Sequence, residues 1–374
     1  MKTRHIIAII ALTVCTAQAG AQGLWDRFYH GWLTKPRNVD SSYIYQQPMG
    51  FSPSLTGNFS RQTVKVTTTM DFRNFTEEIP ILRFIYTDQM TEALSQRAGF
   101  LLAVGRLGAG WSFELAPDSS QHSSTFTFAF RGNKFGMNIN YLDFSQQIIE
   151  SAWLTPMGIF GDTISYDTLP VGNRLRRLTI DGFYVFNTRR FAYPPGIAGN
   201  LVQLRSAGSW MLAGRYMQSH LHLNPDYYPL ANFGTVQFSI GCGYSYTWVP
   251  WSRAPRGGGR KMQSLFLNGT VVPMLTLFNH LTIDPYEELA NALKSSDRRG
   301  IFCWPTPNIL LNATVGYSWD RFYLGAQFNY NIFHFNTRNG ISFDELYFPE
   351  EDMALGFMGI LYEWNLGLKF QACF

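Results

Sequence analysis

The chain ends, from Trp364 to Phe374, in the sequence WNLGLKFQACF. Side chains of an extended strand alternate between two faces, so every second residue from Trp364 onward falls on one face, and all of these are apolar. The opposite face carries polar or small residues, among them Asn365 and Lys369. A last strand of this kind that stops on an aromatic residue is typical of outer-membrane barrels, whose assembly machinery reads that end. We therefore expect a membrane-spanning strand here, with Phe370 and Phe374 as the assembly signal.

The same alternation recurs upstream in segments near the ~9 to 11 residues that a tilted spanning strand needs. Residues 124–131 and 134–144 flank a two-residue turn at Gly132 and Asn133, which predicts a hairpin. From Val236 to Trp248 one face is an apolar stripe longer than a soluble core strand requires. The expected strands lie near residues 62–72, 98–106, 109–116, 124–131, 134–144, 175–187, 206–217, 234–248, 262–272, 308–319, 322–334 and 355–374.

These segments predict an all-β fold, a transmembrane antiparallel β-barrel of about twelve strands with long extracellular loops and short periplasmic turns. One connection, 188–205, is long although the alternation assigns it to the periplasm, so ten and fourteen strands stay open. Trp319 and Phe322 flank a tight turn where an aromatic girdle would lie. We expect Phe128, Phe238, Ile240, Leu311, Phe328 and Leu368 to face lipid, and Gln237, Asn312, Gln327 and Lys369 to face inward.

The amino terminus has the features of a secretory signal peptide over residues 1–21. Lys2 and Arg4 precede an apolar stretch and then small residues around Ala19 and Ala21, where cleavage is favoured over lipidation of Cys15. Residues 22–60 then form a periplasmic or interfacial segment that starts with a short amphipathic helix, either lying in the membrane interface or packed on the periplasmic mouth. The barrel is expected to occupy residues 61–374.

The composition excludes several classes of protein. The chain has 30 Lys and Arg against 26 Asp and Glu, and loss of Lys2 and Arg4 with the signal leaves a charge of +2, too small for nucleic-acid binding. Charged residues are only 15% of the chain and aromatics 16%, as expected when much of the surface faces lipid. Outer-membrane lipid and the barrel-assembly machinery are therefore the expected partners. The scattered cysteines favour neither disulfides nor a zinc site.

Signatures of catalysis are sparse, and we expect no cofactor, no metal and no assigned catalytic residue. His220 and His222 lack a third ligand, and Ser219 beside His220 would point to the opposite face of a strand. A triad built across strands from His122, His334 and nearby serines stays an alternative. In the expected loop 273–307, Asp284 can cap a helix that starts at Pro285.

The inward faces carry an unusual number of charges. The lumen-lining candidates are Lys65, Asp71, Glu114, Arg131, Arg177, Asp181, Arg215 and Lys369. Charges inside a membrane are tolerated when paired or hydrated, so the lumen is either a polar pore or a salt-bridged, filled interior, and the filled interior is favoured. Strands 175–187 and 206–217 would place Asp181 between Arg177 and Arg215.

Four segments resemble an uncharacterised outer-membrane barrel family of Bacteroidota known only as a domain of unknown function (number four thousand four hundred and twenty-one). They are residues 39–44 (VDSSYI), 131–136 (RGNKFG), 186–193 (FNTRRFAY) and 206–210 (SAGSW). The resemblance implies an outer-membrane barrel and brings no known activity. The leading functional hypothesis is a non-enzymatic pore, carrier or envelope structural protein; the alternatives are a lipid-modifying barrel enzyme and an adhesin that acts through its extracellular loops.

Overall fold

The structure of the protein is a computed structural model. It describes residues 29–34, 38–47, 50–73, 81–91, 95–115, 121–132, 134–155, 163–193, 200–222, 231–254, 261–287, 299–336, 347–348 and 353–374. The expected signal peptide and much of the expected extracellular connections lie outside these residues, so the expectations about them stay predictions.

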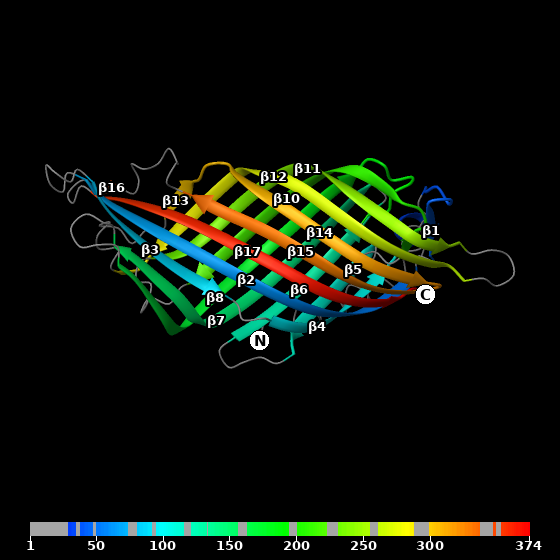
Figure 1. Cartoon of the computed structure of the whole chain (residues 1–374), viewed down its shortest axis with the longest axis horizontal. Coiled ribbons are helices and arrows are strands. Elements are labelled where there is room, and N and C mark those ends of the chain that lie inside the picture. The colour runs from blue at the N-terminus through cyan, green and yellow to red at the C-terminus, as the bar shows by residue number, and fades with distance from the viewer. Residues whose placement is uncertain are drawn as a thin grey trace, which may run out of the picture.

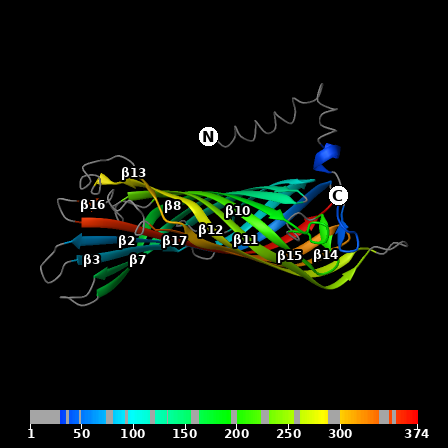
Figure 2. The same cartoon turned by 90° about the horizontal axis from the view of Figure 1, so that it is seen from above.

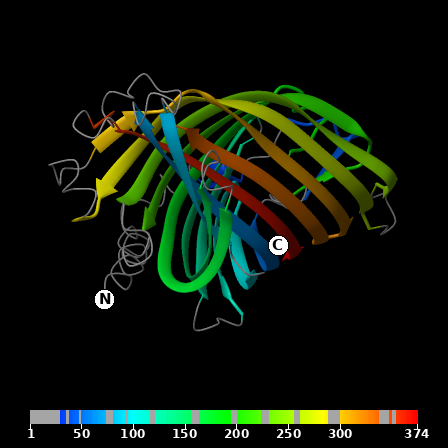
Figure 3. The same cartoon turned by 60° about the vertical axis from the view of Figure 1, so that its left-hand side comes forward.

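The chain folds into a closed antiparallel barrel whose last strand pairs with its first (Figures 1 and 3). The wall contains, in chain order, β2 (Phe51–Arg73), β3 (Ile81–Thr91), β4 (Ser95–Val104), β5 (Leu107–Glu114), β6 (Gln121–Arg131), β7 (Phe135–Thr155), β8 (Thr163–Val185), β10 (Ala207–His222), β11 (Ala231–Arg253), β12 (Gln263–Pro285), β14 (Thr306–Trp319), β15 (Phe322–Asn336) and β17 (Met353–Ala372). Because β3 and β4 pair with β2 end to end, they act as one strand of the wall, and the predicted count of twelve is confirmed.

The wall has fewer strands at one end than at the other. We call the end that holds Phe374 the base. The short β5–β6 hairpin occupies only the half of the wall next to the base, and beyond it β3 pairs directly with β7, from Ile85 with Leu154 to Gln89 with Glu150. Twelve strands therefore surround the lumen at the base and ten at the distal end. Since the width of a barrel grows with its number of strands, the lumen narrows away from the base.

Several strands are longer than the alternation predicts. β2 begins at Phe51, ahead of the expected barrel boundary at residue 61. The alternation did not predict this start because Pro53 and Gly57 interrupt the apolar face of the strand. β12 extends to Pro285, so Asp284 pairs with Asn232 inside the sheet, and the expected helix begins not at Pro285 but at Glu287, the last described residue of this range. β3 was not predicted as a strand at all. The added part of β12 and β3 lie toward the distal end, away from Phe374, whereas the added start of β2 lies at the base.

The outer surface of the wall is apolar and aromatic, as membrane contact requires. Phe238, Ile240, Phe328 and Leu368 are among its exposed large side chains, whereas Gln237 is buried inside. This orientation confirms the predicted assignment of the two faces at these positions. Near the base, Trp319, Phe322 and Phe370 stack on one another with ring centroids 5.7 to 6.3 Å apart, forming part of an aromatic girdle.

The remaining elements lie at the two ends of the wall. A short π-helix, η1 (Tyr29–Leu33), stands at the base near the carboxy terminus (Figure 2). Trp32 stacks on Phe130 of β6 at 5.5 Å, so this segment packs on the base. Gly105, in the β4–β5 turn, has φ +58° and lies against the Leu33 carbonyl, where a Cβ would come within 2.4 Å. At the distal end β13 (Arg299–Phe302) pairs with β12, and β16 (Tyr347–Phe348) with β17.

Among the residues that the structure describes, no helix has both the length and the apolar character needed to cross a membrane.

Candidate functional site

A small folded unit covers the lumen at the base, and we call it the plug. It consists of residues 38–47 with residues 186–193 and 200–206, and its centre is a two-stranded sheet of β1 (Ile44–Gln46) and β9 (Leu201–Gln203). Val202 and Leu204 pack with Met262 of the β11–β12 connection to form its apolar core. The long connection 188–205, which did not fit a short periplasmic turn, is therefore part of a closure of the barrel mouth.

Gln203 holds the plug together. Its Nε2 donates to the carbonyls of Arg190 and Arg205 at 2.7 and 2.8 Å, and its Oε1 accepts from the backbone N–H of Ala192 at 2.9 Å. The Gln203 carbonyl accepts from Ser264 Oγ on the barrel wall at 2.6 Å. The Gln203 side chain thus joins residues 190–192 to Arg205, and its backbone carbonyl anchors the plug to β12.

Two side chains at the edges of the plug have shifted pKa values. Tyr193 reaches into the lumen and packs edge-on against Phe183 at 4.8 Å, and burial there raises the pKa of Tyr193 to about 12. At the exposed edge, hydrogen bonds from the Ser42 hydroxyl and backbone N–H lower the pKa of Asp40. Asp40 therefore stays ionised when the plug is formed, whereas Tyr193 stays neutral.

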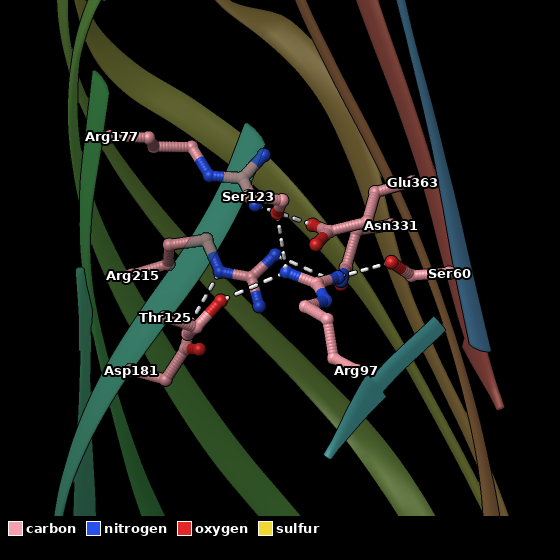
Figure 4. Close-up of polar contacts among 9 residues, drawn as sticks. All are labelled: Ser60, Arg97, Ser123, Thr125, Arg177, Asp181, Arg215, Asn331 and Glu363. Atoms are coloured by element: carbon pink, nitrogen blue, oxygen red, sulfur yellow. Dashed lines mark hydrogen bonds and ion pairs between the residues drawn. The ribbon is translucent and has the colours of Figure 1, made fainter. Parts of the chain in front are cut away.

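Above the plug lies a chamber of about 370 Å³, lined mainly by polar and charged side chains. Two ion pairs lie in this chamber (Figure 4). One spans the lumen, and the other joins two neighbouring strands of the wall. Arg177 of β8 donates to Glu363 of β17, on the opposite side of the barrel, at 2.7 Å. Arg215 of β10 pairs with Asp181, its direct neighbour on β8, and also donates to Asn331 of β15 across the lumen at 3.1 Å.

Arg97 is a third buried arginine in this chamber and has a different environment. Only 4% of its surface is exposed, and its guanidinium donates to the hydroxyls of Ser60, Ser123 and Thr125 (Figure 4). No carboxylate within the described part of the chain lies within ion-pair distance of Arg97, and its Nε has no hydrogen-bond partner there. Within the described residues Arg97 is therefore hydrogen-bonded to neutral groups alone, while Glu114, directly opposite it on β5, bonds to the backbone of Ser123.

The chamber as a whole is cationic. Among the described residues, its lining includes four arginines and also Lys369, against the two carboxylates already named. The fourth arginine, Arg131, donates to the carbonyls of Phe130 and Met137 at 3.2 Å and lies over the ring of Phe183. The lining thus carries at least two more positive than negative charges.

An apolar layer, formed by Leu175, Leu221, Phe233, Phe333 and Phe357, separates the chamber from the distal end. All five side chains are buried inside the barrel. The rings of Phe233 on β11 and Phe357 on β17 pack edge-on with their centroids 5.4 Å apart, although three strands of the wall separate β11 from β17. The layer therefore spans the lumen. Phe333 also lies under the guanidinium groups of Arg177 and Arg215, at 5.8 and 5.0 Å, and joins the layer to the chamber.

The structure brings together five of the predicted lumen-lining residues and places two of them elsewhere, while the side chain of the eighth lies outside the described set. The chamber lining includes Arg131, Arg177, Asp181, Arg215 and Lys369. Glu114 instead lies at the tip of the β5–β6 hairpin, where it accepts from the Ser123 N–H at 3.0 Å. Lys65 is outside the lumen because Val64 and Val66 take the inward positions of β2, and the side chain of Asp71 lies outside the described set.

The predicted placement of Asp181 between two arginines was wrong. Asp181 pairs with Arg215 only, because Arg177 reaches Glu363 across the lumen. Sequence reasoning missed Glu363 and Arg97, whose partners come from distant strands. It also missed the apolar layer, because each of its five side chains comes from a different strand.

The catalytic and metal candidates are not brought together. The strand β10 continues to His222, so Ser219 points inward to Thr235 Oγ1 at 2.5 Å, while His220 is exposed on the other face. Ser123 is engaged by Arg97, and His122 is exposed on the opposite face of β6. Across the described ranges, no group of three or more His, Cys, Asp or Glu side chains is placed to hold a metal ion.

Comparison with known proteins gives the family but no activity. No curated protein matches the chain. Among solved structures, the β-domain of the Bordetella autotransporter BrkA is similar at 9% identity, covering 84% of this chain and 99% of that one with a TM-score of 0.29. The Pseudomonas putida toluene transporter TodX (6% identity, 91% and 99% covered, TM-score 0.24) and the Escherichia coli outer membrane protease OmpT (9%, 85% and 96%, TM-score 0.25) are also similar.

Likenesses at these scores carry no argument about what this chain does. The family model for DUF4421, described as a domain of unknown function, matches residues 98–357, which run from the middle of β4 into β17 and include most of the barrel wall. The chain therefore belongs to the DUF4421 family, and it is a membrane β-barrel with a polar, arginine-lined chamber in its lumen.

Proposed function

We propose that this protein is an outer-membrane carrier that passes small polar solutes through an occluded chamber, and that it is not a permanently open pore. The observation that carries the proposal is the chamber itself, which lies between the plug at the base and the apolar layer on the distal side. A filled structural barrel has no need of a hydrophilic cavity of about 370 Å³ between two closures.

The proposed location follows from the wall. Its exposed aliphatic and aromatic side chains form the surface that a bilayer requires, and closed barrels satisfy every backbone hydrogen bond inside lipid. The short turns Gly105–Arg106 and Asp320–Arg321 and the carboxy terminus all lie at the base. The base would therefore face the periplasm and the long connections the cell exterior.

Transport of a solute would require the plug and the apolar layer to open one after the other. The plug is the weaker closure, because β1 and β9 share only three residue pairs and Gln203 supplies much of the hydrogen bonding that joins its parts. On the other side, the apolar layer is held by side-chain packing, which rotamer changes can open without breaking the wall. Alternate yielding of these closures would expose the chamber to one side at a time.

The proposal is tested by the flux of small polar solutes from liposomes that hold the purified full chain. The variant Gln203→Ala removes the plug hydrogen bonds, and Gln96→Ala, on the exposed face of β4, is the matched control. We expect slow flux for wild type and the control and at least tenfold faster flux for Gln203→Ala. Absence of flux in all three correctly inserted proteins would contradict the carrier and favour an envelope structural role. Equally fast flux in all three would indicate an open pore.

A further inference from the structure

The buried arginines of the chamber differ in the partners that the described residues supply. Arg177 and Arg215 each have one carboxylate, while Arg97 meets hydroxyls. Burying a cation without a counter-charge is costly, and a fold that retains such cations in a lipid-enclosed lumen needs a compensating anion or water. The imbalance is concentrated on the side where Arg97 lies.

Two of these arginines also have donors to spare. Arg97 Nε and Arg177 Nη1 are buried and have no hydrogen-bond partner among the described residues. Buried donors of this kind are usually satisfied, so an unpaired donor on each of two neighbouring guanidinium groups is unusual. An oxygen-rich anion that reached these guanidinium groups would supply acceptors that the described residues do not.

We propose that Arg97, Arg177 and Arg215 form a binding site for a small hydrophilic oxyanion, a carboxylate or phosphate that carries hydroxyl groups. The three guanidinium groups approach from β4, β8 and β10 and line one chamber (Figure 4). A planar guanidinium group forms bidentate hydrogen bonds with two oxygens of a carboxylate or phosphate, which favours these oxyanions over spherical anions. Only the route by which the anion would reach this site, through the plug or the apolar layer, rests on the proposed carrier function.

The rest of the chamber limits what else the ligand contains. Side-chain amides of Asn140, Asn312, Asn329 and Asn331 line it and can both donate to and accept from hydroxyl groups. Its volume of about 370 Å³ falls at the lower end of the ~300 to 1,000 Å³ typical of small-molecule sites. The adjoining apolar layer leaves a cavity of only about 40 Å³, too small for an acyl chain. These limits favour a sugar acid or sugar phosphate over a lipid.

The site is tested by calorimetric titration of the full chain in detergent micelles. The probes are inorganic phosphate, glucose 6-phosphate, glucuronate and, as the neutral control, glucose. We expect the three anions to bind and glucose not to bind, with glucose 6-phosphate and glucuronate separating phosphate from carboxylate preference. Arg97→Gln should weaken binding at least tenfold, Arg97→Lys less, and Arg253→Gln, an exposed arginine near the base, not at all.

A second variant tests the site even if Arg97→Gln does not fold. Glu363→Gln removes the carboxylate that occupies Arg177, so it should tighten binding of the anionic probes several-fold. Failure of folded wild type to bind any anion, or equal weakening by Arg97→Gln and Arg253→Gln, would overturn the site. So would unchanged or weaker binding by Glu363→Gln. Binding without liposome flux would contradict only the carrier, whereas flux without binding would contradict only the site.

Discussion

Single residues decide whether a charge can stay inside the barrel. Asp181 and Arg215 are direct neighbours in the sheet, and the alternation predicts their shared inward face. By contrast, Arg177 and Glu363 are separated by 186 positions along the chain and by the width of the lumen, so no local pattern indicates that they pair. The sequence could therefore show which charges point inward, but not which of them meet.

Loss of the buried pair at Asp181 should cost much more than loss of an exposed one. Asp181→Ala leaves Arg215 buried without a carboxylate, and we expect a loss of about 3 to 5 kcal/mol, reduced by any water in the chamber. The matched control is Asp143→Ala, which breaks an exposed pair with Arg174 and should cost about 1 kcal/mol or less. Thermal and denaturant unfolding in detergent compare the two. Equal costs would mean that the chamber is as wet as the surface.

The loss of folding free energy caused by a charge on the outer face should depend on where along the strand the charge is placed. Leu366 and Met358 both point outward from β17, and both are about two-fifths exposed. Eight residues of a tilted strand separate them by roughly 20 Å, enough to carry Met358 beyond the hydrocarbon. We expect Leu366→Arg to cost about 2 to 4 kcal/mol and Met358→Arg less than about 1 kcal/mol in folding titrations into lipid vesicles. A larger loss of stability from Met358→Arg than from Leu366→Arg would mean that the membrane-embedded part of the wall does not lie around Leu366.

At the scale of elements, the strands were easier to predict than their ends or the plug. The lipid-facing half of each strand must alternate, so residues 234–248 and 308–319 were recognised as strands. Beyond the bilayer this constraint disappears, which explains why β3 and the distal part of β12 were missed. The plug is short, irregular and held by tertiary contacts of Gln203 and Val202, so its sequence carries no period to detect.

Acid should loosen the exposed edge of the plug. The Ser42 hydrogen bonds lower the folded pKa of Asp40 below its ordinary value of 3.8, so ionised Asp40 stabilises this turn above about that pH. The contribution is lost as the pH falls through the depressed folded pKa. We expect hydrogen-exchange protection of residues 38–47, corrected for intrinsic rates, to fall below pH 4 in wild type. Asp40→Asn should show weaker protection at pH 6 and no such fall; identical profiles would contradict this role.

The last strand should matter for assembly. The backbone N–H of Phe374 donates to the Phe51 carbonyl at 2.9 Å, which fastens the chain end to the first strand, while its ring is exposed. If the terminal aromatic residue is part of the assembly signal, deletion of Phe374 should leave export intact but lower the inserted fraction several-fold. Heat-modifiable gel mobility of membrane fractions measures insertion. Phe370→Ala tests the second signal residue, and normal insertion of both variants would refute the signal.

At the scale of the whole molecule, the lumen is divided along its axis. The plug closes the wide base, the cationic chamber occupies the middle, and the apolar layer closes the region where the wall has ten strands. The sequence predicted the barrel, its strand count and a filled interior in preference to a pore. It could not predict the order of these three regions, because each is assembled from inward residues of strands far apart in the chain.

The closed lumen is tested most directly by the conductance of the full chain in planar lipid bilayers. Wild type should show no sustained open channel at moderate voltage, because the plug and the layer formed around Phe233 and Phe357 close both ends. The combined variant Gln203→Ala, Phe233→Ala and Phe357→Ala should conduct, and the surplus arginines should make the current anion-selective. A stable open channel in wild type, with the conductance of the combined variant, would contradict the occluded lumen.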